Sequence, residues 1–282
     1  MTAVFDPGVR PVATAGGRRI ADAFARARSD ARAALIPYVV AGYPDTDGSF
    51  EAALACIDAG ADLLEVGLPY SDPLADGATL QRASAAALTA GATFNGALQL
   101  VRRIAAARPG IPLVPMGYAN QLIGGGTGED GARRLADAGA SAVIVADLTP
   151  DEGEPFAAHA RDRGLEVVYL VAPTTPPERR RWIAERAGGF VYCVSLIGVT
   201  GARRSLSRHV GRLIREVKAV SAVPVAVGFG VSRPAHVRRL AAAGADGVIV
   251  ASALVDALGR DGRDLARLSR LVMSLRDATL AG

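Results

Sequence analysis

The sequence is poor in the residues that staple small or extracellular proteins together. Its 282 residues include only two cysteines, Cys56 and Cys193, which excludes a disulfide framework. Neither belongs to a CxxC or Cys/His cluster of the kind that binds zinc. No apolar run is long enough to span a membrane, and residues 1–16 lack the apolar centre of a signal peptide. These absences favour a cytoplasmic protein, with residues 1–16 as a disordered leader.

Lysine is almost absent as well. Lys218 is the only lysine, so 31 of the 32 basic residues are arginines, and the net charge is +4. The arginines are spread along segments with helical spacing, which is typical of solvated helix faces. No basic block or aromatic RNA-binding motif accompanies them, so we expect no binding to nucleic acid.

Short apolar runs alternate with amphipathic segments along the chain. Such runs are typical of parallel strands, which are buried on both faces. The eight runs are Leu35–Ala41, Asp62–Leu68, Ile111–Met116, Ser141–Asp147, Leu165–Val171, Gly189–Ser195, Val223–Phe229 and Asp246–Ser252. The segments between them carry apolar residues at i, i+3 and i+4, which predicts helices.

Eight strand–helix units favour one particular α/β fold. A closed (β/α)8 TIM barrel accounts for them better than a doubly wound sheet does. An extra N-terminal helix is expected near Gly17–Ala34 and a final helix near Asp264–Leu280. No linker interrupts the chain after the leader, so we expect residues 17–282 to form a single barrel domain.

Three carboxylates lie in and after the second strand run. Active sites of such barrels form at the carboxyl ends of the strands. Glu65 alternates with Leu64 and Val66, so its side chain faces either the barrel interior or the helices. Inside the barrel it would be a general acid or base with a raised pKa; otherwise it is a structurally paired glutamate. Asp72 reads as a turn residue, whereas Asp76 lies far enough along the loop to fold back over Glu65.

Short loops follow the last three strand runs, in the segments IGVTGA, GFGVS and ASALVDAL, and the first two of these contain glycine. Loops after strands seven and eight, with a short helix at the last, form the usual phosphate site of this fold. We therefore predict that Gly201, Gly230, Ala251 and Ser252 bind a phosphate group, the alternative being glycines that only permit tight turns.

Other absences narrow the chemistry of a barrel that binds a phosphate ester. A Schiff-base aldolase needs a lysine at a strand end, whereas Lys218 lies in a helical segment. A metal aldolase needs clustered histidines, but His159, His209 and His236 all lie in helical segments. No metal site is predicted, and any carbon–carbon chemistry must be driven by protons from carboxylates.

The chain resembles the tryptophan synthase α subunit family. The motifs LLEVGLPYSDPLADG, MGYAN, VADL, VSLIGVTGAR, GFGVS and GADGVIV carry the resemblance from about Ile36 to Val255, in family order. The first of them is highly specific, whereas GFGVS is shared with related barrels. Ala251 stands where a phosphate-loop glycine is usual in the family.

The resemblance implies an activity and a role for named residues. The activity is the retro-aldol cleavage of indole-3-glycerol phosphate to indole and glyceraldehyde 3-phosphate, in tryptophan biosynthesis and without a cofactor. Glu65 matches the glutamate that protonates indole C3, and Asp76 the aspartate that hydrogen-bonds the indole N–H. The residues that match the substrate pocket are Tyr38, Tyr118, Tyr192 and Phe229.

The resemblance also implies a lid and a partner. Thr200 matches the threonine that bonds Asp72 when the loop closes over the substrate. Pro73 and Asn120 match contact positions for a β subunit that uses pyridoxal phosphate. Three alternatives stay open: a stand-alone lyase that releases free indole for a specialised pathway, an inactive activator of a β subunit, and another phosphate-binding barrel such as an indole-glycerol phosphate synthase.

Overall fold

A computed structural model describes residues 14–124, 126–195 and 206–280. Its centre is a closed barrel of eight parallel strands in sequential order, in which β1 also pairs with β8. The strands are β1 Ala34–Val40, β2 Leu64–Gly67, β3 Leu113–Gly117, β4 Ala142–Val145, β5 Glu166–Val171, β6 Val191–Val194, β7 Val225–Gly228 and β8 Gly247–Val250. The predicted (β/α)8 barrel is confirmed, and each strand lies within its predicted run or within one residue of it.

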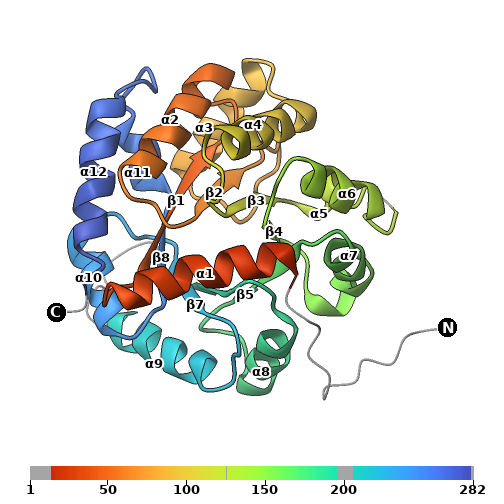
Figure 1. Cartoon of the computed structure of the whole chain (residues 1–282), viewed down its shortest axis with the longest axis vertical. Coiled ribbons are helices and arrows are strands. Elements are labelled where there is room, and N and C mark those ends of the chain that lie inside the picture. The colour runs from red at the N-terminus through yellow and green to blue at the C-terminus, as the bar shows by residue number, and fades with distance from the viewer. Residues whose placement is uncertain (1–13, 125, 196–205, 281–282) are drawn as a thin grey trace.

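Helices surround the barrel, as Figure 1 shows. They are α1 Ala15–Ser29, α2 Thr46–Asp58, α3 Ala78–Thr89, α4 Phe94–Ala107, α5 Ala119–Leu122, α6 Glu129–Asp137, α7 Pro150–Asp162, α8 Pro177–Arg186, α9 Leu206–Lys218, α10 Pro234–Ala242, α11 Ser252–Ala257 and α12 Leu265–Asp277. Helix α12 packs against α2, which brings the last helix beside the first strand–helix unit.

Alternation along the strands separates two apolar cores. In β2, Leu64 and Val66 belong to the outer core between strands and helices. In β1, Ile36 and Tyr38 belong to the inner core within the barrel. Glu65 lies opposite Tyr38 in the parallel register and alternates with the two outer residues, so its side chain faces the barrel interior. This placement decides between the two orientations that the sequence left open.

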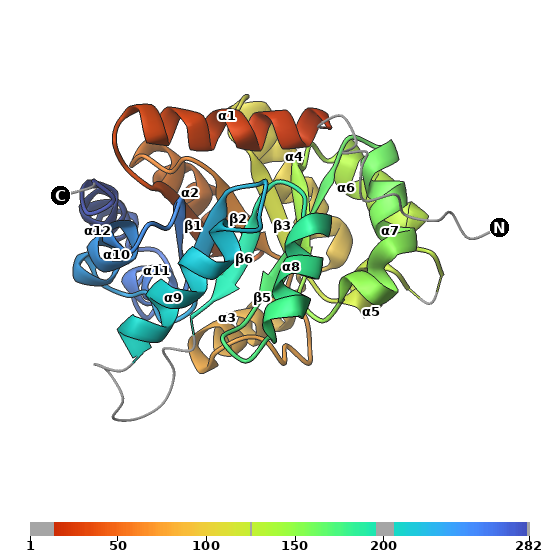
Figure 2. The ribbon, with the colours of Figure 1, turned by 90° about the horizontal axis from the view of Figure 1, so that it is seen from below.

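The extra helix α1 covers one end of the barrel, and α3 with the loop before it lies at the opposite end, as Figure 2 shows. Thr14 caps α1 by accepting a hydrogen bond from the Gly17 amide at 2.9 Å. The helix ends at Ser29, five residues earlier than predicted, because Ala31 adopts a left-handed conformation with φ 54°. Of the predicted leader, residues 1–13 lie outside the described residues.

Candidate active site

Glu65 is a buried carboxyl group in the middle of the barrel. Its residue is 1% exposed, and its Oε2 atom has no hydrogen-bond partner within the described residues. Burial, with a smaller contribution from the charge of Asp76, raises the pKa of Glu65 to about 8. The side chain is therefore a neutral acid at pH 7, able to donate a proton into the space that it faces.

Asp76 is held at the end of a compact loop between β2 and α3. Its amide donates to the Pro73 carbonyl at 3.1 Å, which turns the chain back toward the barrel. Burial raises the pKa of Asp76 to about 6, against the opposing effect of its hydrogen bond with the Tyr118 hydroxyl. Asp76 is therefore ionised at pH 7 and close enough to Glu65 to raise the pKa of that glutamic acid.

Tyr118 fixes this loop from the neighbouring strand–helix unit. Its hydroxyl accepts a hydrogen bond from the Ala75 amide at 3.0 Å and bonds the Asp76 side chain. Its ring stacks on Tyr70 with the centroids 4.9 Å apart. The Gln121 side chain adds a second tie by donating to the Pro69 carbonyl at 2.8 Å.

Two buried tyrosines form walls beside Glu65, and both depend on glycine in the next strand. A Cβ atom on Gly67 would lie 1.8 Å from the Tyr38 hydroxyl oxygen, and one on Gly228 would lie 2.2 Å from that of Tyr192. Only glycine allows these close approaches. Burial, together with the charges of Glu65 and Asp76, raises the pKa of both tyrosine hydroxyls well above 10, so both stay neutral.

Phe229 closes the wall from the loop after β7. Its backbone has φ 70°, a conformation that costs a non-glycine residue roughly 1–3 kcal/mol. The buried Ser195 hydroxyl lies 2.6 Å from the Phe229 carbonyl and 2.7 Å from the Gly228 carbonyl, and it holds the turn in place by donating to these oxygens. The Phe229 ring then meets Tyr192 edge-on, with centroids 5.7 Å apart.

The predicted phosphate residues lie at the ends of neighbouring strands. Gly230 follows Phe229 with φ 72°, and Ala251 precedes α11, where Ser252 is the first helical residue. Because β7 and β8 pair directly, these two loops lie at the same rim of the barrel. Gly201 lies outside the described residues.

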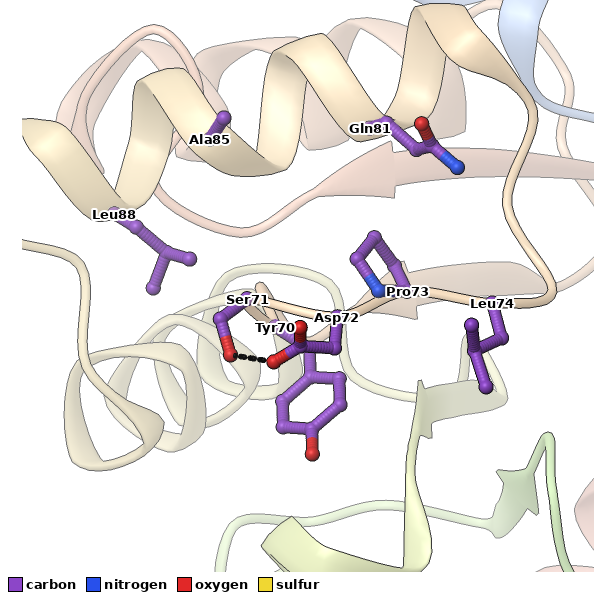
Figure 3. A pocket seen from close by; sticks show the side chains of 8 residues that line it. All are labelled: Tyr70, Ser71, Asp72, Pro73, Leu74, Gln81, Ala85 and Leu88. Atoms are coloured by element: carbon purple, nitrogen blue, oxygen red, sulfur yellow. Dashed lines mark hydrogen bonds between the residues drawn. The ribbon is translucent and has the colours of Figure 1, made fainter.

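The predicted lid forms one side of a cavity of about 560 Å³. The cavity is lined by Tyr70, Ser71, Asp72, Pro73 and Leu74 of the loop and by Gln81, Ala85 and Leu88 of α3. In Figure 3 the Pro73 ring points toward α3, whereas the Tyr70 ring points away from it. The Asp72 carboxylate accepts a hydrogen bond from the Ser71 hydroxyl at 2.5 Å. Leu74 is 91% exposed at the tip of this loop.

The predicted partner residues lie near the same loop. Pro73 is half-buried, whereas Asn120 is exposed and donates to the Tyr70 hydroxyl at 3.3 Å. Thr200, the predicted bonding partner of Asp72, lies outside the described residues. Tyr70 and Gln121 were not singled out from the sequence, although Tyr70 lies within the specific LLEVGLPYSDPLADG motif; only their contacts reveal their role.

Across residues 14–124, 126–195 and 206–280, no three His, Cys, Asp or Glu side chains gather as a metal site would require. In the same ranges, every helix is too short or too polar to cross a membrane.

Comparisons with known proteins agree on one family. The family model described as "Tryptophan synthase alpha chain" matches residues 24–279. The chain is 46% identical over 260 residues to the tryptophan synthase alpha chain of Roseiflexus sp. (strain RS-1), covering 92% of this chain and 99% of that protein. It is 38% identical over 274 residues to the alpha chain of Arabidopsis thaliana, covering 96% and 98%. A chain of the Mycobacterium tuberculosis tryptophan synthase superposes with a TM-score of 0.86 at 41% identity, covering 96% of this chain and 100% of that one.

Proposed function

Because the chain belongs to the tryptophan synthase alpha chain family, we propose that Glu65 and Asp76 carry out its reaction in tryptophan biosynthesis. That reaction is the cleavage of indole-3-glycerol phosphate to indole and glyceraldehyde 3-phosphate, which makes the protein a carbon–carbon lyase. The two carboxyl groups have separate tasks, and the surrounding side chains hold the substrate between them.

Glu65 acts first as the general acid. Its neutral carboxyl group protonates C3 of the indole ring, while the Asp76 carboxylate hydrogen-bonds the ring N–H and stabilises the cationic indolenine. The Glu65 carboxylate then takes the proton of the glycerol hydroxyl next to the ring. The carbon–carbon bond breaks, its electron pair returns to the ring, and indole and the aldehyde result. Protonation makes the ring an electron sink, so the residues need no Schiff base.

The remaining predicted residues orient the substrate and exclude water. Tyr38, Tyr118, Tyr192 and Phe229 enclose the indole ring with apolar surface. Gly230, Ala251 and Ser252, with Gly201, hold the phosphate group. The loop after β2 acts as the lid, because it carries Asp76 and so closes and completes the site in one movement.

One observation supports this proposal most strongly. Glu65 is a buried acid whose Oε2 has no hydrogen-bond partner among the described residues, with a pKa raised to about 8, beside Asp76 with a pKa raised only to about 6. Two carboxyl groups with separated pKa values divide into an acid and an ionised stabiliser. At pH 7 each is in the protonation state that its proposed task requires.

A cytoplasmic location and a β-subunit partner are part of the proposal. The partner would contact Pro73 and Asn120 and would consume the indole that this chain releases. Leu74, exposed beside Pro73, adds apolar surface to that contact.

The test is indole release from indole-3-glycerol phosphate by the purified chain, alone and with a tryptophan synthase β subunit. Weak release alone that rises sharply with the β subunit is expected of an α subunit. Strong release that the β subunit does not change would instead indicate a stand-alone lyase. No indole under either condition would contradict the proposed reaction.

A further inference from the structure

A second cavity lies on the outside of the barrel, next to the predicted phosphate loops. It has a volume of about 590 Å³ and is bounded by the loop after β7, by α11 and by one face of α12. Ser252 lines it, and Ser232 lines it two residues after Gly230. The cavity therefore borders the loops that are predicted to hold the substrate phosphate.

Three arginines line this cavity: Arg233, Arg267 and Arg270, all of them exposed. Only one acidic residue, Asp256, lies among the cavity-lining residues. The local charge is therefore +2, half of the net charge of the whole chain. A cleft with an excess of positive charge attracts anions.

What sets these arginines apart is that three of them gather around one cavity without an acidic partner for any of them within the described residues. Arg263 and Arg276, at either side along the chain, pair with Asp45 and Asp30. In contrast, the guanidinium groups of the three cavity-lining arginines make no hydrogen bond or ion pair within residues 14–124, 126–195 and 206–280. Like charges that share a cleft repel one another, and an anion bound between the three guanidinium groups would relieve that repulsion.

We propose that this cavity is an accessory anion site for phosphate monoester dianions, which captures the phosphate end of the substrate before it passes to the loops after β7 and β8. The inference rests on the proposed function for the identity of that substrate. Guanidinium forks match phosphate oxygens, and exposed side chains favour rapid capture and release over tight binding. Because Ser252 borders both sites, a captured dianion has a short path to the catalytic phosphate position.

The first test replaces all three arginines by glutamine, a good helix former of similar length. The KM for indole-3-glycerol phosphate should rise about fivefold at low ionic strength, with kcat unchanged, because only the charge that attracts the dianion is lost. At about 0.3 M salt the difference should vanish, since screening removes the attraction.

The matched control carries Arg26→Gln, Arg102→Gln and Arg181→Gln. These arginines are exposed, lie on α1, α4 and α8, and change the net charge equally. Their KM should stay at the wild-type value. An equal KM rise in both triple variants would show a general effect of net charge and would overturn the proposal, as would an unchanged KM in the cavity variant.

Asp256→Asn tests the effect of making the cavity more positive, because it removes the one acidic residue that lines it. Its KM at low ionic strength should fall about twofold; a rise would contradict an anion site.

A direct binding measurement separates this inference from the proposed reaction. Inorganic phosphate is added to the wild-type chain and to both triple variants, and the broadening of its ³¹P resonance is followed. The cavity variant should broaden the signal less than the control variant does. Equal broadening would overturn the accessory site, even if indole is released normally. Absence of indole release with reduced broadening would contradict the proposed reaction alone.

Discussion

Asp62 and Glu65 are carboxylates only three residues apart, but they differ sharply in their hydrogen bonding. Asp62 lies toward one end of the barrel and Glu65 toward the other. Asp62, just before β2, receives two hydrogen bonds from the Arg32 guanidinium at 2.7 and 2.8 Å and one from the Leu35 amide at 2.8 Å. Glu65, within β2, has an Oε2 atom without a hydrogen-bond partner among the described residues. The end of the barrel that α1 covers, here the closed end, thus satisfies its acid, whereas the opposite, open end leaves one unsatisfied in the part of the chain that the structure describes.

Within this short segment, Asp62 contributes to the stability of the fold, whereas Glu65 is the residue proposed to carry out the chemistry. A half-buried ion pair, in which one carboxylate accepts several hydrogen bonds, fixes the ends of β1 and β2 together. A buried acid without a partner costs free energy, because burial disfavours its ionised form. That cost is what raises the pKa of Glu65 to about 8 and keeps a proton available. The barrel therefore gives up stability at the residue that we propose as the general acid.

The largest effect is expected for Glu65→Gln. The kcat for indole formation should fall at least roughly 1,000-fold, because the amide cannot donate the proton, whereas substrate binding should stay largely intact. Wild-type kcat in this variant would contradict the mechanism.

The same variant reveals the cost of the buried acid. The unfolded carboxyl group releases its proton near pH 4.5 and the folded one only near pH 8, so wild-type stability relative to Glu65→Gln should fall as the pH rises between these values. The slope should reach about 1.4 kcal/mol per pH unit, measured by urea unfolding of both proteins. Parallel stability curves would mean that Glu65 is not a buried acid of raised pKa.

At the closed end, Asp62→Asn should lower the stability of the protein while leaving its activity almost unchanged. It removes the closer of the two carboxylates that pair with the Arg32 guanidinium and leaves Asp30 at 3.1 Å, so the free energy of unfolding should fall by about 1–3 kcal/mol. The kcat of the folded protein should stay within about twofold of wild type, because Asp62 precedes β2 whereas the loop that carries Asp76 follows it. A large loss of kcat without loss of stability would remove the distinction between the two ends.

The smallest effect is expected for Tyr118→Phe. Loss of the hydroxyl frees the Ala75 amide and removes one hydrogen bond from Asp76, while the stacking on Tyr70 remains. Without that bond, which lowers the pKa of Asp76, the acid limb of the pH profile should move to higher pH, with about a tenfold loss of kcat/KM at pH 6. An unmoved acid limb would show that Tyr118 acts only through packing.

The strands and their order could be predicted from the sequence because buried parallel strands leave continuous apolar runs. The ends of helices were harder to predict from the sequence. Helix α1 ends at Ser29 because Ala31 adopts a left-handed conformation, and an alanine gives no sign in the sequence that it will do so. The motif around Glu65 identified a site, but alternation alone left its direction undecided. The barrel register opposite Tyr38 supplied that direction.

Contacts between loops could not be predicted from the sequence for a different reason. The bond between the Tyr118 hydroxyl and the loop before α3 joins residues 43 positions apart, and the Ser195 hydroxyl reaches the Phe229 carbonyl across 34. Neither contact has a local signature, because serine and tyrosine are common at strand ends. Such long-range polar contacts depend on strand order and register together.

The most direct test of the contrast between the two ends is the pH dependence of kcat/KM for indole formation by the wild-type chain. The proposed mechanism requires both ionised Asp76 and neutral Glu65, so the profile should be bell-shaped, with an acid limb near pH 6 and an alkaline limb near pH 8. A profile that keeps rising above pH 8 would contradict the account, because the ionised form of Glu65 would then be the one that starts the reaction.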